Sequence, residues 1–249
     1  MSDYNRSGAR AIPAGRADMA VDAGLRAFML GVYNKLGLGL VLSAGLAWVT
    51  SHEPAVNLMF RLSPDGRVTG YTVLGMAVMW APLAILLGAG FIMRSVTPRS
   101  SGIIYWSVVS LIGASLGLVM LVYTGASVVS TFFATAAAFG GLSLVGYTTK
   151  KDLTGFGSFL IVGLIGLVIA SVVNIFLHST AMQFMISAIG VLIFAGLIAY
   201  DTQRLKMTYY QLGGDEAAMG VATNMGALNL YLDFVNLFRF LLMFMGNRR

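Results

Sequence analysis

The sequence has no cysteine, and it has few of the charged residues on which soluble proteins and most enzymes depend. Without cysteine there can be no disulfide, no thiolate metal site and no cysteine nucleophile. Charged residues make up only 10% of the 249 positions and hydrophobic residues 57%, whereas soluble domains are about 25% charged. This composition excludes a soluble globular domain. Acid–base or ion chemistry must therefore rest on ten acidic residues and two histidines.

Recognisable catalytic patterns are also missing. The two histidines, His52 and His178, fall at the ends of apolar runs, and neither belongs to a metal-binding spacing or a catalytic triad. The chain has no phosphate-binding glycine loop and no HExxH motif. We therefore expect a protein that is not an enzyme and holds no resident cofactor. The net charge of +6 indicates basic loops at a membrane surface and not the binding of nucleic acid.

In place of charge, the sequence has long apolar runs. Each run has roughly 20 to 24 residues, enough to cross a hydrocarbon core about 30 Å thick as a helix. The alternation with period two that is typical of a membrane β-barrel is absent. The sequence therefore predicts an all-α integral membrane protein with seven transmembrane helices. The runs cover residues 27–49, 70–93, 103–124, 126–147, 156–177, 181–200 and 224–245.

Basic residues predict the orientation of these helices. Alternate loops, beginning with the N-terminal segment, carry ten Lys and Arg residues, whereas the opposite loops and the C-terminus carry four. Because cytoplasmic loops hold the excess of basic residues, we predict a polar cytoplasmic tail over residues 1–26 and one transmembrane domain over residues 27–249. Arg248 and Arg249 run against this rule, which leaves open a seventh segment that re-enters the membrane. The preference for arginine over lysine, with much glycine and alanine, favours a bacterial inner membrane.

Four charged residues fall within a predicted span or at its end. A charge at the centre of a transmembrane helix costs on the order of 2.5–3.5 kcal/mol on insertion scales, so each one needs a partner, a cavity or a function. Lys35 and Arg239 have long aliphatic stems, which favours snorkelling of their charged ends to the membrane surface. Asp201 and Asp233 have no such stem. They are the strongest candidates for a functional site.

Asp233 lies in a polar stripe on an otherwise apolar segment. Asn229, Asp233 and Asn236 are spaced at i, i+4 and i+7, so the three side chains share one helical face. A stripe of this kind belongs inside a helical bundle or beside water. Two interpretations follow. The stripe is an ion or proton site, or it is a packing face in which the two amides hydrogen-bond the carboxylate.

Asp201 is ambiguous when taken alone. It ends the run 181–200, and pairing with Arg204 at i+3 would explain it as a residue of a helix end. The predicted topology brings Arg94, at the end of the second run, to the same level, so a salt bridge between Arg94 and Asp201 is geometrically possible. Counting residues puts Asp233 about 13 Å deeper than Asp201. The two aspartates can meet only if the seventh helix starts lower or the sixth ends higher than these bounds.

Two segments resemble a known family. The Tyr200–Asp201 pair and residues 230–238, LYLDFVNLF, are similar to the signature of the Bax inhibitor-1 (transmembrane Bax inhibitor motif) family, and the similarity extends over essentially all seven runs. The resemblance implies a bundle in which six helices surround a central seventh. It also implies that Asp201 and Asp233 lie close enough to share a proton.

The resemblance further implies a pH-sensitive calcium leak, with Arg94 as a latch on Asp201. Loss of the shared proton would add a second negative charge, which attracts a hard cation such as Ca²⁺ and strengthens the pull on Arg94. Asn229 and Asn236 can supply further oxygen atoms. The prediction is a site in which Asp201 and Asp233 bind Ca²⁺ or a proton, and in which protonation biases the bundle between a closed, Arg94-latched form and an open one.

Two other functions stay open. Some bacterial relatives in this family are modulators of a membrane-bound ATP-dependent protease, and the tail of residues 1–26 could contact such a partner without any transport activity. A proton-coupled transporter would also use buried carboxylates. The sequence disfavours a transporter because it has no pair of broken, Gly/Pro-interrupted helices in matching halves.

Overall fold

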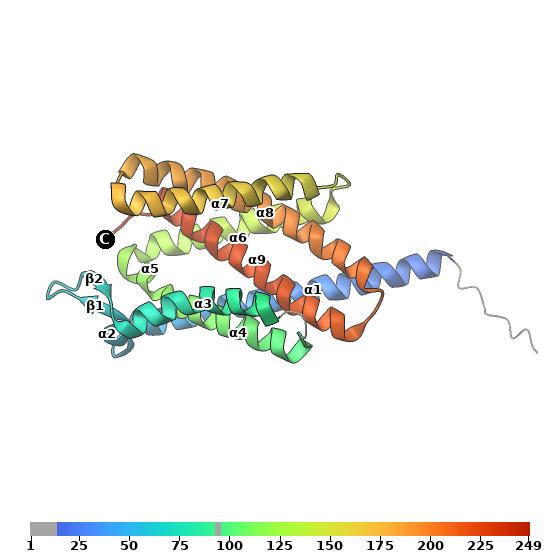
Figure 1. Cartoon of the computed structure of the whole chain (residues 1–249), viewed down its shortest axis with the longest axis horizontal. Helices are drawn as coiled ribbons and strands as arrows, with labels where there is room; N and C mark the ends of the chain where they lie inside the picture. The colour runs from blue at the N-terminus through green and yellow to red at the C-terminus, as the bar shows by residue number, and fades with distance from the viewer. Residues whose placement is uncertain (1–13, 93–95) are drawn as a thin grey trace, which may run out of the picture.

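The computed structural model describes residues 14–92 and 96–249, and almost all of this part of the chain is helical (Figure 1). Seven helical segments in it are long and apolar enough to cross a membrane, as predicted. The third segment consists of two consecutive helices, separated at Leu116. The helices that form the bundle are α1 (Ala14–Thr50), α3 (Val73–Ile92), α4 (Pro98–Ser115), α5 (Gly117–Val122), α6 (Gly125–Thr148), α7 (Thr154–Leu177), α8 (Thr180–Leu212) and α9 (Glu216–Met245).

A small extramembrane unit connects α1 to α3. It consists of the short helix α2 (Ala55–Met59) and an antiparallel hairpin of β1 (Phe60–Leu62) and β2 (Val68–Tyr71). Gly66 takes a φ of 75° in the turn of this hairpin, a conformation that glycine adopts without strain. We call this end of the bundle the hairpin end. The opposite end, where Lys150, Lys151 and Lys206 lie, is called the basic end.

Several helices extend past the apolar runs that predicted them. α1 begins at Ala14, inside the predicted tail of residues 1–26, α8 continues to Leu212, and α9 begins at Glu216. Local signals set the last two ends. α8 stops at Gly213, which has a φ of 58°, and the carboxylate of Asp215 accepts hydrogen bonds from the first backbone N–H groups of α9. Hydropathy marks the part of a helix that lies in lipid, not the helix end.

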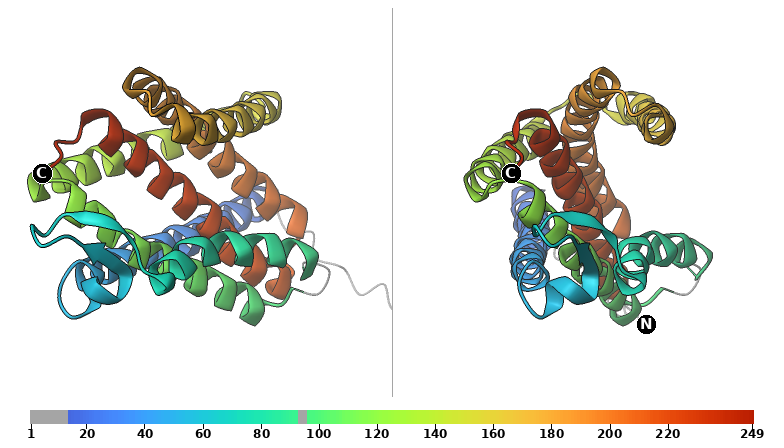
Figure 2. Two further views of the ribbon diagram at one scale, coloured as in Figure 1. Left: turned by 60° about the vertical axis from the view of Figure 1, so that its left-hand side comes forward. Right: turned by 90° about the vertical axis from the view of Figure 1, so that its left-hand side faces the viewer.

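The predicted central seventh helix is confirmed. α9 crosses the bundle obliquely and contacts α1, α4, α6 and α8, whereas α3 packs mainly on α4 and α7 on α8, at outer positions (Figure 2). In the apolar segment of α9, 50% of the residues are buried, against 11% in that of α7. Its fully buried side chains include Leu230, Tyr231 and Leu237. α9 is therefore the element around which the other spans are arranged.

The seventh segment runs the full length of the bundle and does not re-enter. It begins at the basic end and stops at the hairpin end, where the C-terminal residues pair with the chain between α5 and α6. The N–H of Thr124 donates to the carbonyl of Asn247 at 3.0 Å, and Tyr123 forms a β-bridge with Arg248. The Arg248 guanidinium lies 5.8 Å from the centroid of the Tyr123 ring. This terminal arginine therefore has a structural role at the hairpin end.

Candidate functional site

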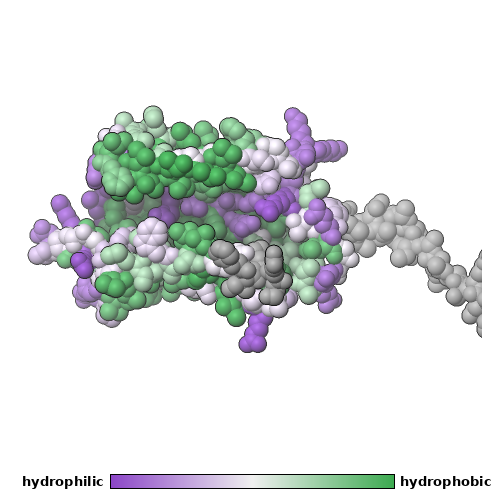
Figure 3. All heavy atoms as spheres, viewed as in Figure 1, coloured by the Kyte–Doolittle hydropathy of each residue, from purple (hydrophilic) through white to green (hydrophobic). Residues whose placement is uncertain are grey.

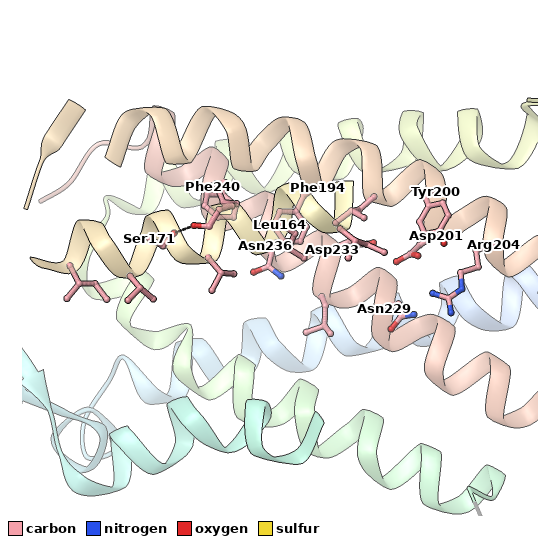
Figure 4. Close-up of a pocket in the computed structure, with 17 residues that line it drawn as sticks. Leu164, Ser171, Phe194, Tyr200, Asp201, Arg204, Asn229, Asp233, Asn236 and Phe240 are labelled. Atoms are coloured by element: carbon pink, nitrogen blue, oxygen red, sulfur yellow. Dashed lines mark hydrogen bonds between the residues drawn. The ribbon is translucent and has the colours of Figure 1, made fainter. Parts of the chain in front are cut away.

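Asp201 of α8 and Asp233 of α9 lie against each other where the two helices cross. Figure 4 shows their carboxyl groups pointing toward one another, and a side-chain hydrogen bond joins them. Such a bond requires a proton on one of the two groups, because an ionised carboxylate only accepts. Asp233 is 6% exposed and Asp201 is partly buried. The structure thus brings together the two residues that sequence counting had placed at different depths.

The two aspartates meet because α9 begins closer to the basic end of the bundle than its apolar run does. Asp201 lies well inside α8, and Asp233 lies just past the middle of α9. The oblique course of α9 lets it gain less height per residue than a helix parallel to the bundle axis (Figure 1). The predicted difference in depth between Asp201 and Asp233 is therefore wrong. It was counted from the ends of the apolar runs, and hydropathy did not report where α9 begins.

Close packing holds the turn of α8 that carries Asp201. A Cβ added to Gly146 of α6 would come within 2.9 Å of the Cα of Ala199, and one added to Gly157 of α7 would lie 2.7 Å from the Cγ atom of Tyr200 and closer still to other atoms of its ring. Both distances are shorter than a van der Waals contact. The absence of side chains at these two glycines lets α6 and α7 clamp α8 directly before Asp201.

The interpretation of Asp201 as a helix-end residue is wrong. α8 continues for about three further turns, to Leu212. Arg204 lies one turn along the helix and is exposed, and it acts on Asp201 through its charge. The hydrogen bond of Asp201 goes instead to Asp233.

The polar stripe on α9 is not an internally satisfied packing face. Apart from the contact with Asp201, the Oδ2 atom of Asp233 is buried without a hydrogen-bond partner among the described residues. Asn229 is exposed and Asn236 is half-buried, and both side chains point into the same space as the carboxyl group (Figure 4). Buried polar atoms without a partner are rare and mark places where water or an ion can bind. We call Asn229, Asp233 and Asn236 the cavity face of α9.

A cavity of about 550 Å³ adjoins this face between α7, α8 and α9. The wall supplied by α7 is mostly apolar, and the polar groups come from α8 and α9. A volume of this size holds several water molecules, and the site offers them hydrogen-bond partners. The polar side chains that line it are Ser171, Tyr200, Asp201, Arg204, Asn229, Asp233 and Asn236.

Two further cavities share walls with this one. Toward the basic end, a cavity of about 590 Å³ shares Tyr200 and Arg204 with it and reaches Lys151. Toward the hairpin end, a cavity of about 370 Å³ shares Leu232 and Asn236 with it. Figure 3 shows hydrophilic residues in the hollow between the hydrophobic surfaces of α7 and α3. The aspartate pair therefore lies in the middle of a row of three adjoining cavities.

The other predicted site features stand as follows. Arg94 lies outside the described residues, so its role as a latch stays a prediction. Within residues 14–92 and 96–249, no group of three or more His, Cys, Asp or Glu side chains could hold a metal ion. Ca²⁺ takes six to eight oxygen ligands. Asp201 and Asp233 would therefore need amide and water oxygens to complete its coordination.

Sequence reasoning missed a second polar cluster, on the opposite side of α9. Lys35 of α1 donates to the Oδ1 atom of Asn224. The amide nitrogen of Asn224 donates in turn to the carbonyl of Pro98 at 2.9 Å and to the Oγ of Ser101 at 2.8 Å. The snorkelling predicted for Lys35 is wrong, because its amine is bound inside the bundle. The signal available in the sequence was Asn224 itself, an amide side chain at the start of the last apolar run. The structure shows that this side chain is buried.

The same side of α9 carries a second buried group further along. The hydroxyl of Tyr231 lies 2.7 Å from the Oγ of Ser43, and Ser43 also donates to the carbonyl of Val109 at 3.2 Å. Asn224 and Tyr231 are seven residues apart and share one helical face. We call these two residues the anchored face of α9.

Comparison with known proteins gives the family of the chain. Residues 25–249 match the family described as "Inhibitor of apoptosis-promoting Bax1". A protein of Caulobacter vibrioides described as uncharacterised is 65% identical over 249 residues, 100% of both chains. Inner membrane protein YbhL of Escherichia coli is 41% identical over 238 residues, 94% of this chain and 98% of that one. A membrane protein of Streptococcus pyogenes is 35% identical over 225 residues, 90% of this chain and 94% of its own length. The family match covers residues 25–249 and each of these relatives covers 90% or more of the chain, so the chain belongs to the Bax inhibitor-1 family.

Proposed function

We propose that this protein is a pH-sensitive calcium leak in which the Asp201–Asp233 pair binds a proton and a cation in alternation. The observation that carries the proposal is the contact between the two carboxyl groups at the centre of a row of cavities. Apart from the contact with Asp201, the buried Oδ2 atom of Asp233 has no hydrogen-bond partner in the described part of the chain, which supports the binding of a ligand from the cavity.

The chemistry of the pair couples pH to cation binding. Two carboxyl groups in contact titrate as a unit, because ionising both leaves two negative charges side by side. When the proton leaves, a divalent cation can neutralise the second charge, and oxygen ligands suit Ca²⁺ best. The amide oxygens of Asn229 and Asn236 line the same cavity and can complete the coordination together with water. Reprotonation weakens the hold on the cation.

Protonation also acts on the proposed latch. A guanidinium group and Ca²⁺ compete for the same carboxylates, and both are released when the pair gains a proton. If Arg94 closes the cavity by binding Asp201, acidification removes part of the charge that holds it. We therefore expect the calcium leak to increase as the pH falls.

The test is to measure calcium flux into proteoliposomes over about pH 5 to 8 for wild type and for Asp233→Asn. In wild type, we expect the carboxyl pair to set the pH dependence of the flux. The amide keeps the shape of the side chain but cannot exchange the proton, so the variant should lose most of the pH dependence. Asp65→Asn is the matched control, because it makes the same change in an exposed turn of the hairpin. An unchanged pH profile in Asp233→Asn contradicts the role of the pair. Absence of flux in wild type contradicts the leak itself.

The alternative function, modulation of a membrane-bound ATP-dependent protease without transport, has a separate test. Its proposed contact is the N-terminal segment, but α1 already begins at Ala14 and Leu25 lies in the core at 2% exposure. A deletion of residues 1–13 therefore leaves α1 intact, whereas deletion of the whole predicted tail would disturb the bundle. Loss of a protease phenotype with unchanged flux would show that the two functions are separable.

A further inference from the structure

The third cavity of the row, on the side of the hairpin end, has a lining unlike that of the other two. It measures about 370 Å³, and its lining includes one cationic side chain, Arg239, but no aspartate or glutamate. Neutral polar groups from Tyr71, Ser115 and Asn236 lie around it. The rest of the wall is apolar and comes largely from α3, with further residues from α5 and α9.

Arg239 is a cation in a membrane-spanning helix that lacks an internal counter-charge. Among the residues that the structure describes, its side chain makes no hydrogen bond or ion pair, and it is exposed. It lies about two turns before the end of α9 at Met245, on the hairpin side. A guanidinium at this depth is costly unless an anion or a headgroup accepts its hydrogen bonds. The five N–H donors of arginine match the oxygens of a phosphate group.

Tyr71 is placed to assist such an anion. Its ring packs against Phe60 across the hairpin, with the ring centroids 5.6 Å apart. Burial raises the pKa of the Tyr71 phenol above its usual value, although the nearby charge of Arg239 acts in the opposite direction. The phenol therefore keeps its proton and can donate a hydrogen bond next to the guanidinium.

We propose that this cavity is a binding site for a phosphate-bearing anion, the headgroup phosphate of a phospholipid at the hairpin end. The phosphate would bind between Arg239 and Tyr71, and an acyl chain would follow the apolar wall formed by Met79, Leu83 and Leu86 of α3. A polar end joined to an apolar wall, about two turns before the end of a membrane-spanning helix, matches the chemistry of a phospholipid and not that of a small soluble anion alone. Lipid binding is measured without calcium flux, so this proposal and the proposed function can fail separately, although the cavity adjoins that of the aspartate pair.

Binding can be measured on the full chain in maltoside detergent, by native mass spectrometry and by the shift of the thermal unfolding midpoint. The ligands are dioleoylphosphatidylglycerol, dioleoylglycerol, which has the same chains without phosphate, and inorganic phosphate. We expect phosphatidylglycerol to bind and to stabilise wild type. Arg239→Gln should weaken its binding by about tenfold, because a charge-assisted contact is lost. Arg239→Lys should keep part of the affinity, and Tyr71→Phe should weaken binding by roughly two- to threefold.

Arg61→Gln is the matched control, because Arg61 is an exposed arginine of the same hairpin that does not line the cavity. Equal affinity for phosphatidylglycerol in wild type and Arg239→Gln overturns the proposal. Equal stabilisation by dioleoylglycerol also overturns it, because that result describes an acyl groove without recognition of phosphate. If inorganic phosphate protects wild type as well as the lipid does, and Arg239→Gln removes this protection, the anion site is supported and its assignment to a lipid is overturned.

Discussion

The two faces of α9 use polar residues in opposite ways. On the anchored face, Asn224 has three hydrogen-bond partners from α1 and α4, and the hydroxyl of Tyr231 lies against Ser43. On the cavity face, Asp233 keeps a buried oxygen without a partner in the described part of the chain, although its carboxyl group is joined to Asp201. Buried polar groups that have all their hydrogen-bond partners make a core rigid, whereas buried polar groups without a partner can bind water or ions.

This difference indicates how one helix can hold its place and still exchange ligands. The anchored face connects α9 to α1 and α4, which fixes its position in the bundle. The cavity face is then free to bind protons, water or cations without having to support the helix. At about 100° per residue, the two faces lie roughly 150° apart, on nearly opposite sides of α9. The residues that hold the helix in place are therefore separate from those that line the cavity.

The largest expected effect comes from breaking the anchored face. Asn224→Ala should lower the free energy of unfolding by about 2–4 kcal/mol, because it leaves the Lys35 amine without its partner inside the bundle. Asn229→Ala makes the same change on the exposed cavity face and should cost less than about 0.5 kcal/mol. Thermal unfolding in detergent measures both. Equal losses of stability would show that the two faces do not differ as the structure indicates.

A smaller effect is expected from moving α8 away from its place beside α9. Gly146→Ala would press a methyl group onto the backbone of Ala199, two residues before Asp201, at a cost of about 1–3 kcal/mol. It should also reduce the pH dependence of flux, because the aspartates would separate. Gly141→Ala is the matched control in α6, since a Cβ there meets nothing within 4 Å. That variant should be neutral or slightly stabilised, by up to about 1 kcal/mol.

The smallest expected effect is a difference in stability between two tyrosine-to-phenylalanine variants. Tyr231→Phe removes a buried hydroxyl that contacts Ser43 and should destabilise the fold by about 1 kcal/mol. Tyr200→Phe removes a hydroxyl on the cavity wall that makes no hydrogen bond to the residues the structure describes, and should stay within about 0.5 kcal/mol of wild type. Chemical denaturation of the two variants side by side measures the difference. A larger loss in Tyr200→Phe would place the tightly bonded network on the cavity side instead.

Much of the site could be predicted from local pattern. The stripe of Asn229, Asp233 and Asn236 follows from helical periodicity, and the structure has all three on the same cavity. The role of Lys35 could not be predicted in this way. Its partner Asn224 is 189 residues away, and no local signal distinguishes a lysine that snorkels from one that reaches a buried amide.

The sequence by itself determined the number of spans, the polar stripe on the seventh span, and the two aspartates as the unusual charges. These follow from hydropathy and periodicity, which act over one helix at a time. Only the tertiary structure decided that α8 and α9 run past their apolar segments and cross obliquely, so that Asp201 meets Asp233. That contact depends on helix ends set by Gly213 and Asp215 and on the packing of Gly146 and Gly157 against α8. Packing between distant segments sets relative depth, and the pattern of a single segment carries no measure of it.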